Sequence, residues 1–180
     1  MRPIKITELL LAIDALTGFS RHFTHLHTSE PAPNRAALFA AILADATNLG
    51  VSKMASACPG LSEAELAWVS DWYLRDEAYT KALADLVNAQ HEQWLAQFYG
   101  TGTTSSSDGQ RFPMGGRREA QGQVIARYGP EPSSMFYTHT SDRYAPFATR
   151  AIIANVHQAP YVLDGLLYQA LTRDSCHQPH

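Results

Sequence analysis

The spacing of apolar residues changes at Gly100, and this change constrains the fold more than any other feature of the 180-residue chain. Before Gly100, apolar residues recur three and four positions apart, which is the period of one face of an α-helix. After it, Gly, Ser, Thr and Pro become more frequent and the apolar spacing shifts toward two, the period of a β-strand. The sequence therefore predicts an α/β (α+β) chain, with a helical region over residues 1–100 and a mixed region after it.

Four helices are predicted in the helical region, over residues 5–18, 34–50, 61–74 and 75–100. Asn34 is a good N-cap for the second, and Ser62 with Glu65 forms a capping box for the third. The predicted stops are the glycines Gly18, Gly50 and Gly100. The core is expected from the side chains that continue these helical stripes, namely Leu38, Ile42, Leu66, Val69, Leu83, Leu86 and Trp94. Trp68 and Trp72 also fall on helices and are expected in the core.

The mixed region is predicted to hold three strands and one helix. The strands are expected over residues 104–112, 134–142 and 149–157, and the helix over residues 160–171 with Pro160 in its first turn. Residues 112–122 and 129–133 are expected to be turn-rich connections. Three strands and one helix bury a poor core and leave a sheet edge unpaired, so we expect an incomplete domain over residues 101–168. Residues 169–180 lack periodicity and are expected to be a divergent tail.

The net charge, the cysteines and the N-terminal segment indicate which partners and which compartment to expect. The net charge of -3 gives no overall basic surplus, so binding to DNA would depend on a local patch. The two cysteines, Cys58 and Cys176, form no CxxC motif and are expected to be free thiols. Glu8 and Asp14 interrupt the apolar N-terminal segment, which excludes a signal peptide and a membrane span there. We therefore expect a cytoplasmic protein without a membrane partner.

Asp108 is the first candidate for a functional residue. On a strand, the small neighbours Ser105, Ser107 and Gly109 would leave its carboxylate open to a hard cation such as Mg²⁺. The alternative is that Asp108 caps a turn, because Asp-Gly is a common turn pair. From spacing alone, the turn is favoured.

His22, His25 and His27 form the densest histidine cluster and could bind a transition metal. However, His25 and His27 share a face only on a strand, and no acidic motif lies nearby. A packed or surface loop is therefore favoured over a metal site. A small metal hydrolase that uses these histidines with Asp108 is the least favoured function.

Arginines are concentrated in the mixed region and are interspersed with few acids. A Gly-rich segment, "FPMGGRREAQGQ", could place two guanidinium groups along a phosphate backbone. An ordinary solvated surface explains the same residues equally well. The candidate DNA-binding residues are Arg111, Arg117, Arg118, Arg127, Arg143 and Arg150.

Several long blocks of the sequence, in this order, resemble the catalytic region of the Tn3 family transposases. The resemblance runs from about Ile4 to Tyr168, nearly the whole chain. The blocks are "KITELLLAIDALTGFSRHFTHLHTSEP", "LFAAILADATNLGVSKMASACPG", "LAWVSDWYLRDEAYTKALADLVNAQHEQ", "GTTSSSDGQRF", "FYTHTSDRYAPF" and "YVLDGLLY".

The resemblance implies a ribonuclease-H-like catalytic domain whose Asp-Asp-Glu triad holds two Mg²⁺ ions for DNA strand cleavage and transfer. Asp108 matches the first catalytic aspartate and hence a metal ligand, which reverses the preference for a turn. Neither Asp164 nor Asp174 occupies the position of the second aspartate. The expected partners are DNA, at transposon ends and target sites, and a full-length transposase.

The leading hypothesis is thus a truncated DDE transposase, with the start of an incomplete ribonuclease-H-like domain after a helical region. A single carboxylate is a poor site for Mg²⁺, so we expect no cleavage or strand transfer by this chain alone. The alternative is a module that binds DNA or transposase and interferes with transposition.

Overall fold

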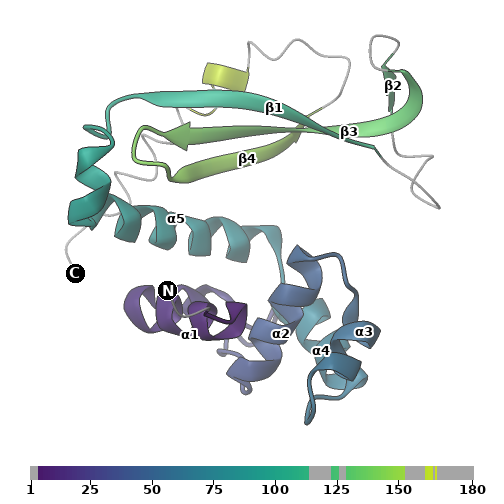
Figure 1. Ribbon diagram of the computed structural model, residues 1–180. Coiled ribbons are helices and arrows are strands. Elements are labelled where there is room, and N and C mark those ends of the chain that lie inside the picture. The colour runs from purple at the N-terminus through teal and green to yellow at the C-terminus, as the bar shows by residue number, and fades with distance from the viewer. Residues whose placement is uncertain (1–3, 114–122, 126–128, 153–160, 164, 166–180) are drawn as a thin grey trace. The chain divides into compact units, whose positions relative to one another are not determined.

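The computed structural model describes residues 4–113, 123–125, 129–152, 161–163 and 165 (Figure 1). The chain divides into two compact units, residues 1–86 (unit 1) and residues 87–180 (unit 2). The boundary falls inside the helix α5 (Asp76–Glu92), so the end of this helix belongs with the sheet. The α+β class predicted from the sequence is confirmed.

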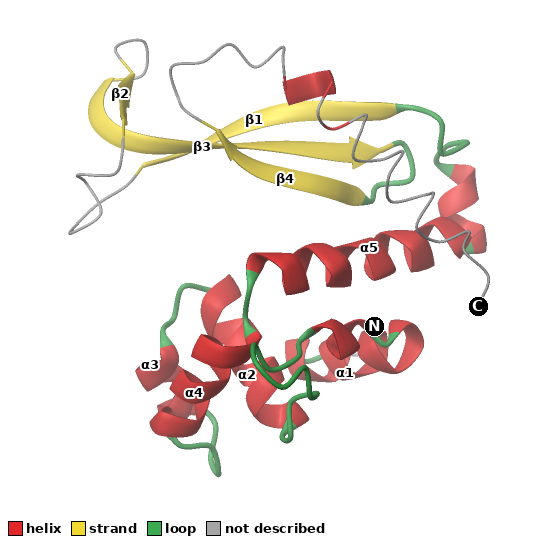
Figure 2. Ribbon diagram, turned by 180° about the vertical axis from the view of Figure 1, so that it is seen from behind, coloured by secondary structure: helices red, strands yellow, loops and turns green. Residues whose placement is uncertain are grey.

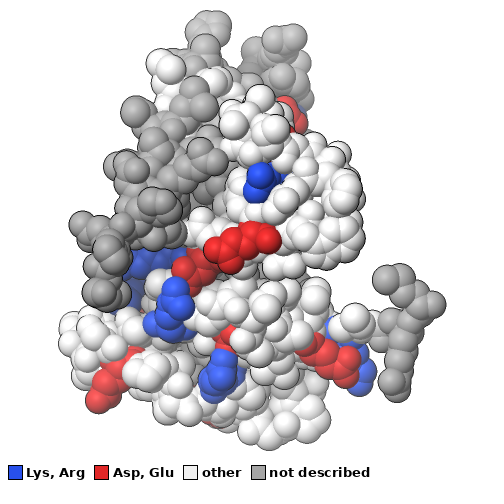
Figure 3. Space-filling model, turned by 90° about the vertical axis from the view of Figure 1, so that its left-hand side faces the viewer, with Lys and Arg blue, Asp and Glu red and all other residues white. Residues whose placement is uncertain are grey.

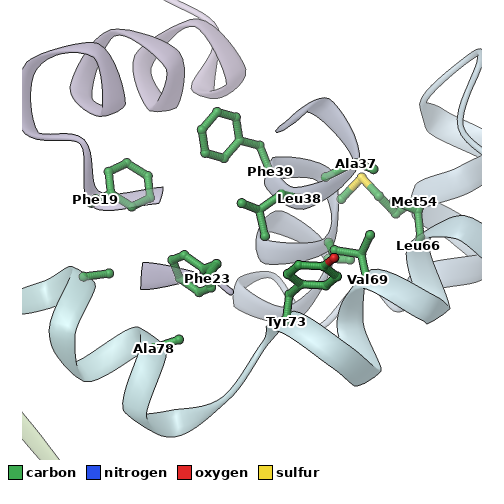
Figure 4. Close-up of a cluster of buried hydrophobic side chains, with 14 residues drawn as sticks. Phe19, Phe23, Ala37, Leu38, Phe39, Met54, Leu66, Val69, Tyr73 and Ala78 are labelled. Carbon is green, nitrogen blue, oxygen red and sulfur yellow. The ribbon is translucent and has the colours of Figure 1, made fainter. Parts of the chain in front are cut away.

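The described secondary-structure elements of unit 1 are all helices. It contains α1 (Ile6–Thr17), the 3₁₀ helix η1 (Phe19–His22), α2 (Arg35–Ala46), α3 (Val51–Ala57), α4 (Glu63–Tyr73) and the first part of α5. Side chains from all of these elements except α1 contribute fully buried apolar residues to one core. Figure 4 shows Phe23, Leu38 and Tyr73 pointing into the same space, with Val69 beside them.

Local signals in the sequence set several helix ends as predicted. Gly18 has φ 66° and donates its N–H to the Asp14 carbonyl at 2.7 Å, which ends α1. The Asn34 side chain accepts from the N–H groups of Ala36 and Ala37 and begins α2. Ser62 Oγ accepts from the Glu65 N–H at 3.1 Å, while Glu65 Oε1 accepts from Asn34 Nδ2 at 2.8 Å. The capping glutamate thus links the starts of two helices.

Two predicted helix boundaries are wrong. The second helix ends at Ala46, because Asn48 adopts the left-handed conformation (φ 51°) that asparagine tolerates. Gly50 therefore precedes the unpredicted helix α3 instead of ending α2. The fourth helix ends at Glu92, because Gln93 has extended angles (φ -65°, ψ 127°), and the 3₁₀ helix η2 (Trp94–Phe98) follows.

These boundaries alter the predicted core. Leu38, Leu66 and Val69 are fully buried as expected, and Ile42 and Leu86 pack partly buried against them. Trp94 is 68% exposed, because the change of helix type at Gln93 takes it off the helical stripe. Trp68 is 41% exposed, so its position on a helix did not place it in the core.

In the described part of unit 2, all paired strands are antiparallel (Figure 2). They are β1 (Ser105–Pro113), β2 (Gln123–Ile125), β3 (Gly129–Ser141) and β4 (Pro146–Ile152). The strand β3 is central: it pairs with β1 along one side, with β4 along the other, and with β2 near its start. This leaves β1 at an edge of the sheet that the structure describes.

The predicted strands at 104–112 and 134–142 are confirmed, and the third begins earlier, at Pro146. Residues 129–133, predicted to be a connection, form the start of β3, because Gly129 and Ser133 pair with β2. Residues 153–157 of the third predicted strand lie outside the described residues. Of the predicted helix at 160–171, the described residues 161–163 and 165 are helical.

None of the helices within the described ranges has the length and apolar character that crossing a membrane requires.

Candidate active site

Asp108 lies in the middle of β1, with its side chain exposed. Its Cα partner on β3 is Thr138, and Gly109 pairs with Tyr137. Asp108 Oδ1 accepts a hydrogen bond from the Gly109 N–H at 2.9 Å. The turn favoured by spacing alone is therefore wrong, because both residues of the Asp-Gly pair are part of a β-ladder.

The face of the sheet that carries Asp108 is open and rich in hydroxyl groups. Ser106 and Gln110 are exposed on either side of Asp108, because side chains two apart on a strand share a face. Across the sheet, Thr138 pairs with Thr149 of β4, and their Oγ1 atoms lie 3.4 Å apart. Asp108 thus has small or polar neighbours on its strand and across the sheet.

The opposite face of β1 is held by a buried histidine that the sequence analysis missed. Ser107 Oγ lies 2.7 Å from His139 Nδ1, and His139 is only 4% exposed. A Cβ placed on Gly165 would lie 2.2 Å from the His139 ring, so the helical residue Gly165 packs its backbone directly on this ring. The sequence signal that could have identified His139 as buried is the period of two along the strand, which puts it on the same face as Met135 and Tyr137.

The segment that leads into β1 is fixed by the turn between β3 and β4. Asp142 accepts from the Gly102 N–H at 2.9 Å and from Thr104 Oγ1 at 2.9 Å. Partial burial would raise the pKa of Asp142, but the hydrogen bonds from Thr104 and Gly102 and the Arg143 charge together hold it below its usual value. The loop before Asp108 is therefore anchored and is not a free linker.

The predicted DNA-binding arginines fall into different environments. Arg143 donates to the carbonyl oxygens of His91 (2.7 Å), Thr101 (3.0 Å) and Gly100 (3.2 Å), so most of its guanidinium fixes the chain. The register places Arg111 and Arg150 on the face of Met135 and Tyr137, opposite Asp108. Arg117, Arg118 and Arg127 lie outside the described residues. On the face drawn in Figure 3, blue and red side chains are interspersed.

The three clustered histidines do not converge on a metal site. His22 Nε2 lies 2.7 Å from Asp85 Oδ2, whereas His25 stacks on Trp72 with the ring centroids 5.1 Å apart. His25 Nδ1 accepts from the N–H groups of His27 and Thr28. Within the described ranges, no three His, Cys, Asp or Glu side chains are grouped so that they could hold a metal ion. The packed-loop interpretation fits these contacts.

The family described as "Tn3 transposase DDE domain" matches residues 8–177. The chain belongs to this family, which confirms the resemblance found in the sequence.

Relatives from three organisms are transposases. The chain is 57% identical to the transposase of transposon Tn501 from Pseudomonas aeruginosa and 53% identical to that of Tn3926 from Escherichia coli, each over 92% of this chain and 17% of the relative. It is 39% identical to the transposase of Tn1546 from Enterococcus faecium, over 92% of this chain and 17% of that relative. The chain thus spans about one sixth of the length of these relatives.

Proposed function

We propose that this chain contributes the first catalytic carboxylate, Asp108, to the cleavage and transfer of DNA strands by a Tn3-type transposase. The observation that carries the proposal is the exposed position of Asp108 on a strand whose neighbours are small or polar. At such an exposed position, a carboxylate can contact a metal cation and a DNA phosphodiester at the same time. Family membership supplies the reaction class.

The chemistry of Asp108 fits a divalent metal such as Mg²⁺. A carboxylate oxygen is a hard donor of the kind that Mg²⁺ prefers, and Mg²⁺ binds through one or two carboxylates together with substrate phosphates and water. When bound, the metal would polarise a phosphoryl oxygen. Asp108 would supply one ligand, oriented by the Gly109 N–H that holds its Oδ1 atom.

By itself, the chain should not catalyse strand transfer. The described residues bring no group of three His, Cys, Asp or Glu together, and Asp164 and Asp174 lie outside them. The second aspartate and the glutamate of the family pattern would then have to come from elsewhere in a transposase. Because its substrate would be bacterial DNA, we place the protein in the cytoplasm.

DNA contact is part of the same proposal. Arg117, Arg118 and Arg127 remain candidates for contact with the phosphate backbone, whereas Arg111 and Arg150 would contact it only on the face opposite Asp108. Arg143 is the weakest of the six, because three backbone carbonyls already accept hydrogen bonds from its guanidinium.

The first test asks whether the chain cuts DNA alone. We expect no Mg²⁺-dependent nicking of a transposon-end duplex by the purified protein. Efficient nicking that Asp108→Ala abolishes would disprove the proposed inactivity while supporting the catalytic role of Asp108.

The second test places Asp108 in a complete enzyme. The matched segment of the Tn501 transposase is replaced by the corresponding residues of this chain, and transposition frequency is measured in cells. Asp108→Asn should lower the frequency by more than about 100-fold, beyond the loss typical of a residue that only supports a metal ligand. The matched control is Asp71→Asn, an exposed aspartate on α4, which should leave the frequency unchanged. Equal frequencies for Asp108→Asn and the unsubstituted chimera would remove Asp108 from the mechanism.

A further inference from the structure

Unit 2 exposes a group of large apolar side chains that are neighbours in sequence or paired through their rings, here called the aromatic patch. Its members are 52–77% exposed and come from η2, the residue after it, and the turn between β3 and β4: Trp94, Leu95, Phe98, Tyr99 and Tyr144. The rings of Trp94 and Phe98 meet edge to face at 5.6 Å, and those of Tyr99 and Tyr144 at 4.9 Å. Four of these five side chains are aromatic: Trp94 and Phe98 pair within η2, and Tyr99 pairs with Tyr144, which is 45 residues later in the sequence.

The patch rests on a rigid support. Beneath it, Ala96 is 1% exposed, and Arg143 ties the β3–β4 turn to the carbonyl oxygens of His91, Gly100 and Thr101. Tyr144 has φ 58°, the left-handed angle that a short hairpin loop requires at this position, and its N–H donates to the Ser141 carbonyl at 3.0 Å. The turn thus holds Tyr144 in place while leaving the residue 71% exposed.

The chemistry of the patch favours a protein partner over a nucleic acid. The segment 93–99 contains no charged residue, and the neighbouring Asp142 and Arg143 are engaged in hydrogen bonds to the segment before β1. Exposed aromatic residues without charges are typical of the centre of protein–protein interfaces. A surface for DNA would need lysines or arginines to neutralise phosphates.

The relatives indicate which protein covers the patch. The patch lies within residues 8–177, which match the family, and the chain corresponds to only 17% of the Tn501 transposase. Most of such a transposase therefore lies outside this region and is covalently linked to it. We propose that the aromatic patch docks onto the part of a transposase chain outside the region that this chain matches. The inference deepens the transposase-binding alternative and does not depend on the catalytic role of Asp108.

The direct test is capture of a transposase that lacks its own copy of the matched segment. Tagged chain is mixed with a Tn501 transposase from which the matched segment has been deleted, and the dissociation constant is measured. We expect binding that weakens by at least about 30-fold when Trp94→Ser, Phe98→Ser and Tyr144→Gly are combined, because two or more hot-spot side chains are lost. Glycine at position 144 suits the left-handed backbone, so the turn should stay folded.

A matched control distinguishes this surface from general stickiness. Leu26→Ser combined with Trp68→Ser removes two exposed apolar side chains from unit 1 and should leave the dissociation constant unchanged. Complete Tn501 transposase should bind the chain more weakly than the deleted form, because its own matched segment competes at high effective concentration.

A second measurement needs no deleted transposase. Trp94 is replaced by a photo-crosslinking phenylalanine analogue, the chain is co-expressed with complete Tn501 transposase, and the crosslinked peptides are identified. Crosslinks outside the matched segment support the proposal, whereas crosslinks confined to that segment, or to a second copy of this chain, overturn it. Unchanged capture by the triple variant would also overturn it. So would DNA binding, followed by fluorescence anisotropy, that the triple variant loses.

Discussion

The described part of unit 1 buries fourteen residues in one apolar core, from Phe19 to Ala82, whereas that of unit 2 has an apolar cluster of Met135, Tyr137 and Ile152 with Tyr161 against it. Both units also hold polar contacts between distant segments, such as Tyr79 with Asp45 in unit 1 and Ser107 with His139 in unit 2. Burial of apolar surface is non-directional, but hydrogen bonds depend on geometry. The candidate active site therefore lies in the unit with the smaller described apolar cluster.

The largest expected effect of a single substitution lies in the core of unit 1. Leu66 is fully buried, and Leu66→Ala should lower the free energy of unfolding by about 3 kcal/mol through lost burial and the cavity left behind. Urea unfolding followed by the helical circular dichroism signal measures this. Leu16→Ala on α1, where the side chain is 67% exposed, should cost below about 0.5 kcal/mol. Equal losses for both would mean that the core of unit 1 is not as packed as described.

The corresponding substitution in unit 2 is at His139. His139→Ala removes the partner of Ser107, the ring contact with Tyr137 at 5.0 Å, and the surface on which Gly165 packs. We expect a loss of about 2 kcal/mol, smaller than for Leu66→Ala, with faster amide hydrogen exchange along β1. Thr149→Ala, on the opposite and exposed face, is the control and should change exchange little. Unchanged exchange in β1 for His139→Ala would show that His139 does not hold this strand.

The range over which a signal acts along the chain explains how much of the fold could be predicted from the sequence. Helix starts and stops in unit 1 were predictable where the signal is local, as at Gly18, Asn34 and Ser62, because each cap involves residues within four positions. The failures arose where the backbone changed type between two helical stretches. The helical spacing of apolar residues continues in the sequence past Asn48 and Gln93. The helices nevertheless end before them, because Asn48 has left-handed backbone angles and Gln93 has extended ones.

The candidate site was less predictable than the fold. The spacing predicted a strand over residues 104–112 but still favoured a turn at Asp108 itself, and the family resemblance reversed that preference. The contacts that support Asp108 could not be predicted, because Ser107 and His139 are 32 positions apart and Gly102 and Asp142 are 40 apart. No local pattern encodes such pairs, and they depend on the register between β1 and β3.

A smaller effect is expected at alkaline pH in unit 1. Burial, followed by the hydrogen bond to Asp45 and the Asp45 charge, raises the pKa of Tyr79 far above its ordinary value of 10.0. The Tyr79 hydroxyl donates to Asp45 Oδ2 at 2.8 Å. Because the folded-state pKa is the higher one, this contribution is fully present below about pH 10 and is lost as the pH rises above it.

Tyr79→Phe should therefore cost about 1 kcal/mol near neutral pH, the typical net value of one hydrogen bond. It should also flatten the decline of unfolding free energy above about pH 10. Urea unfolding of both proteins across the alkaline range measures the effect. Parallel declines would assign the alkaline loss to other groups, of which Tyr73 is the first candidate, because burial and the nearby Glu30 charge also raise its pKa.

The smallest expected effect lies in unit 2 and has the opposite pH dependence. The hydrogen bonds from Thr104 and Gly102 and the Arg143 charge outweigh desolvation and lower the pKa of Asp142 below 3.8. Its contribution is thus present above about pH 4 and is lost as the pH falls through the folded-state value. Asp142→Asn should speed exchange of the Gly102 amide at neutral pH and remove its acid dependence, with Asp71→Asn as the exposed control. An equal increase in Gly102 amide exchange at low pH in the wild type and in Asp142→Asn would contradict this prediction. The contacts of Asp142 would then not anchor the segment before Asp108.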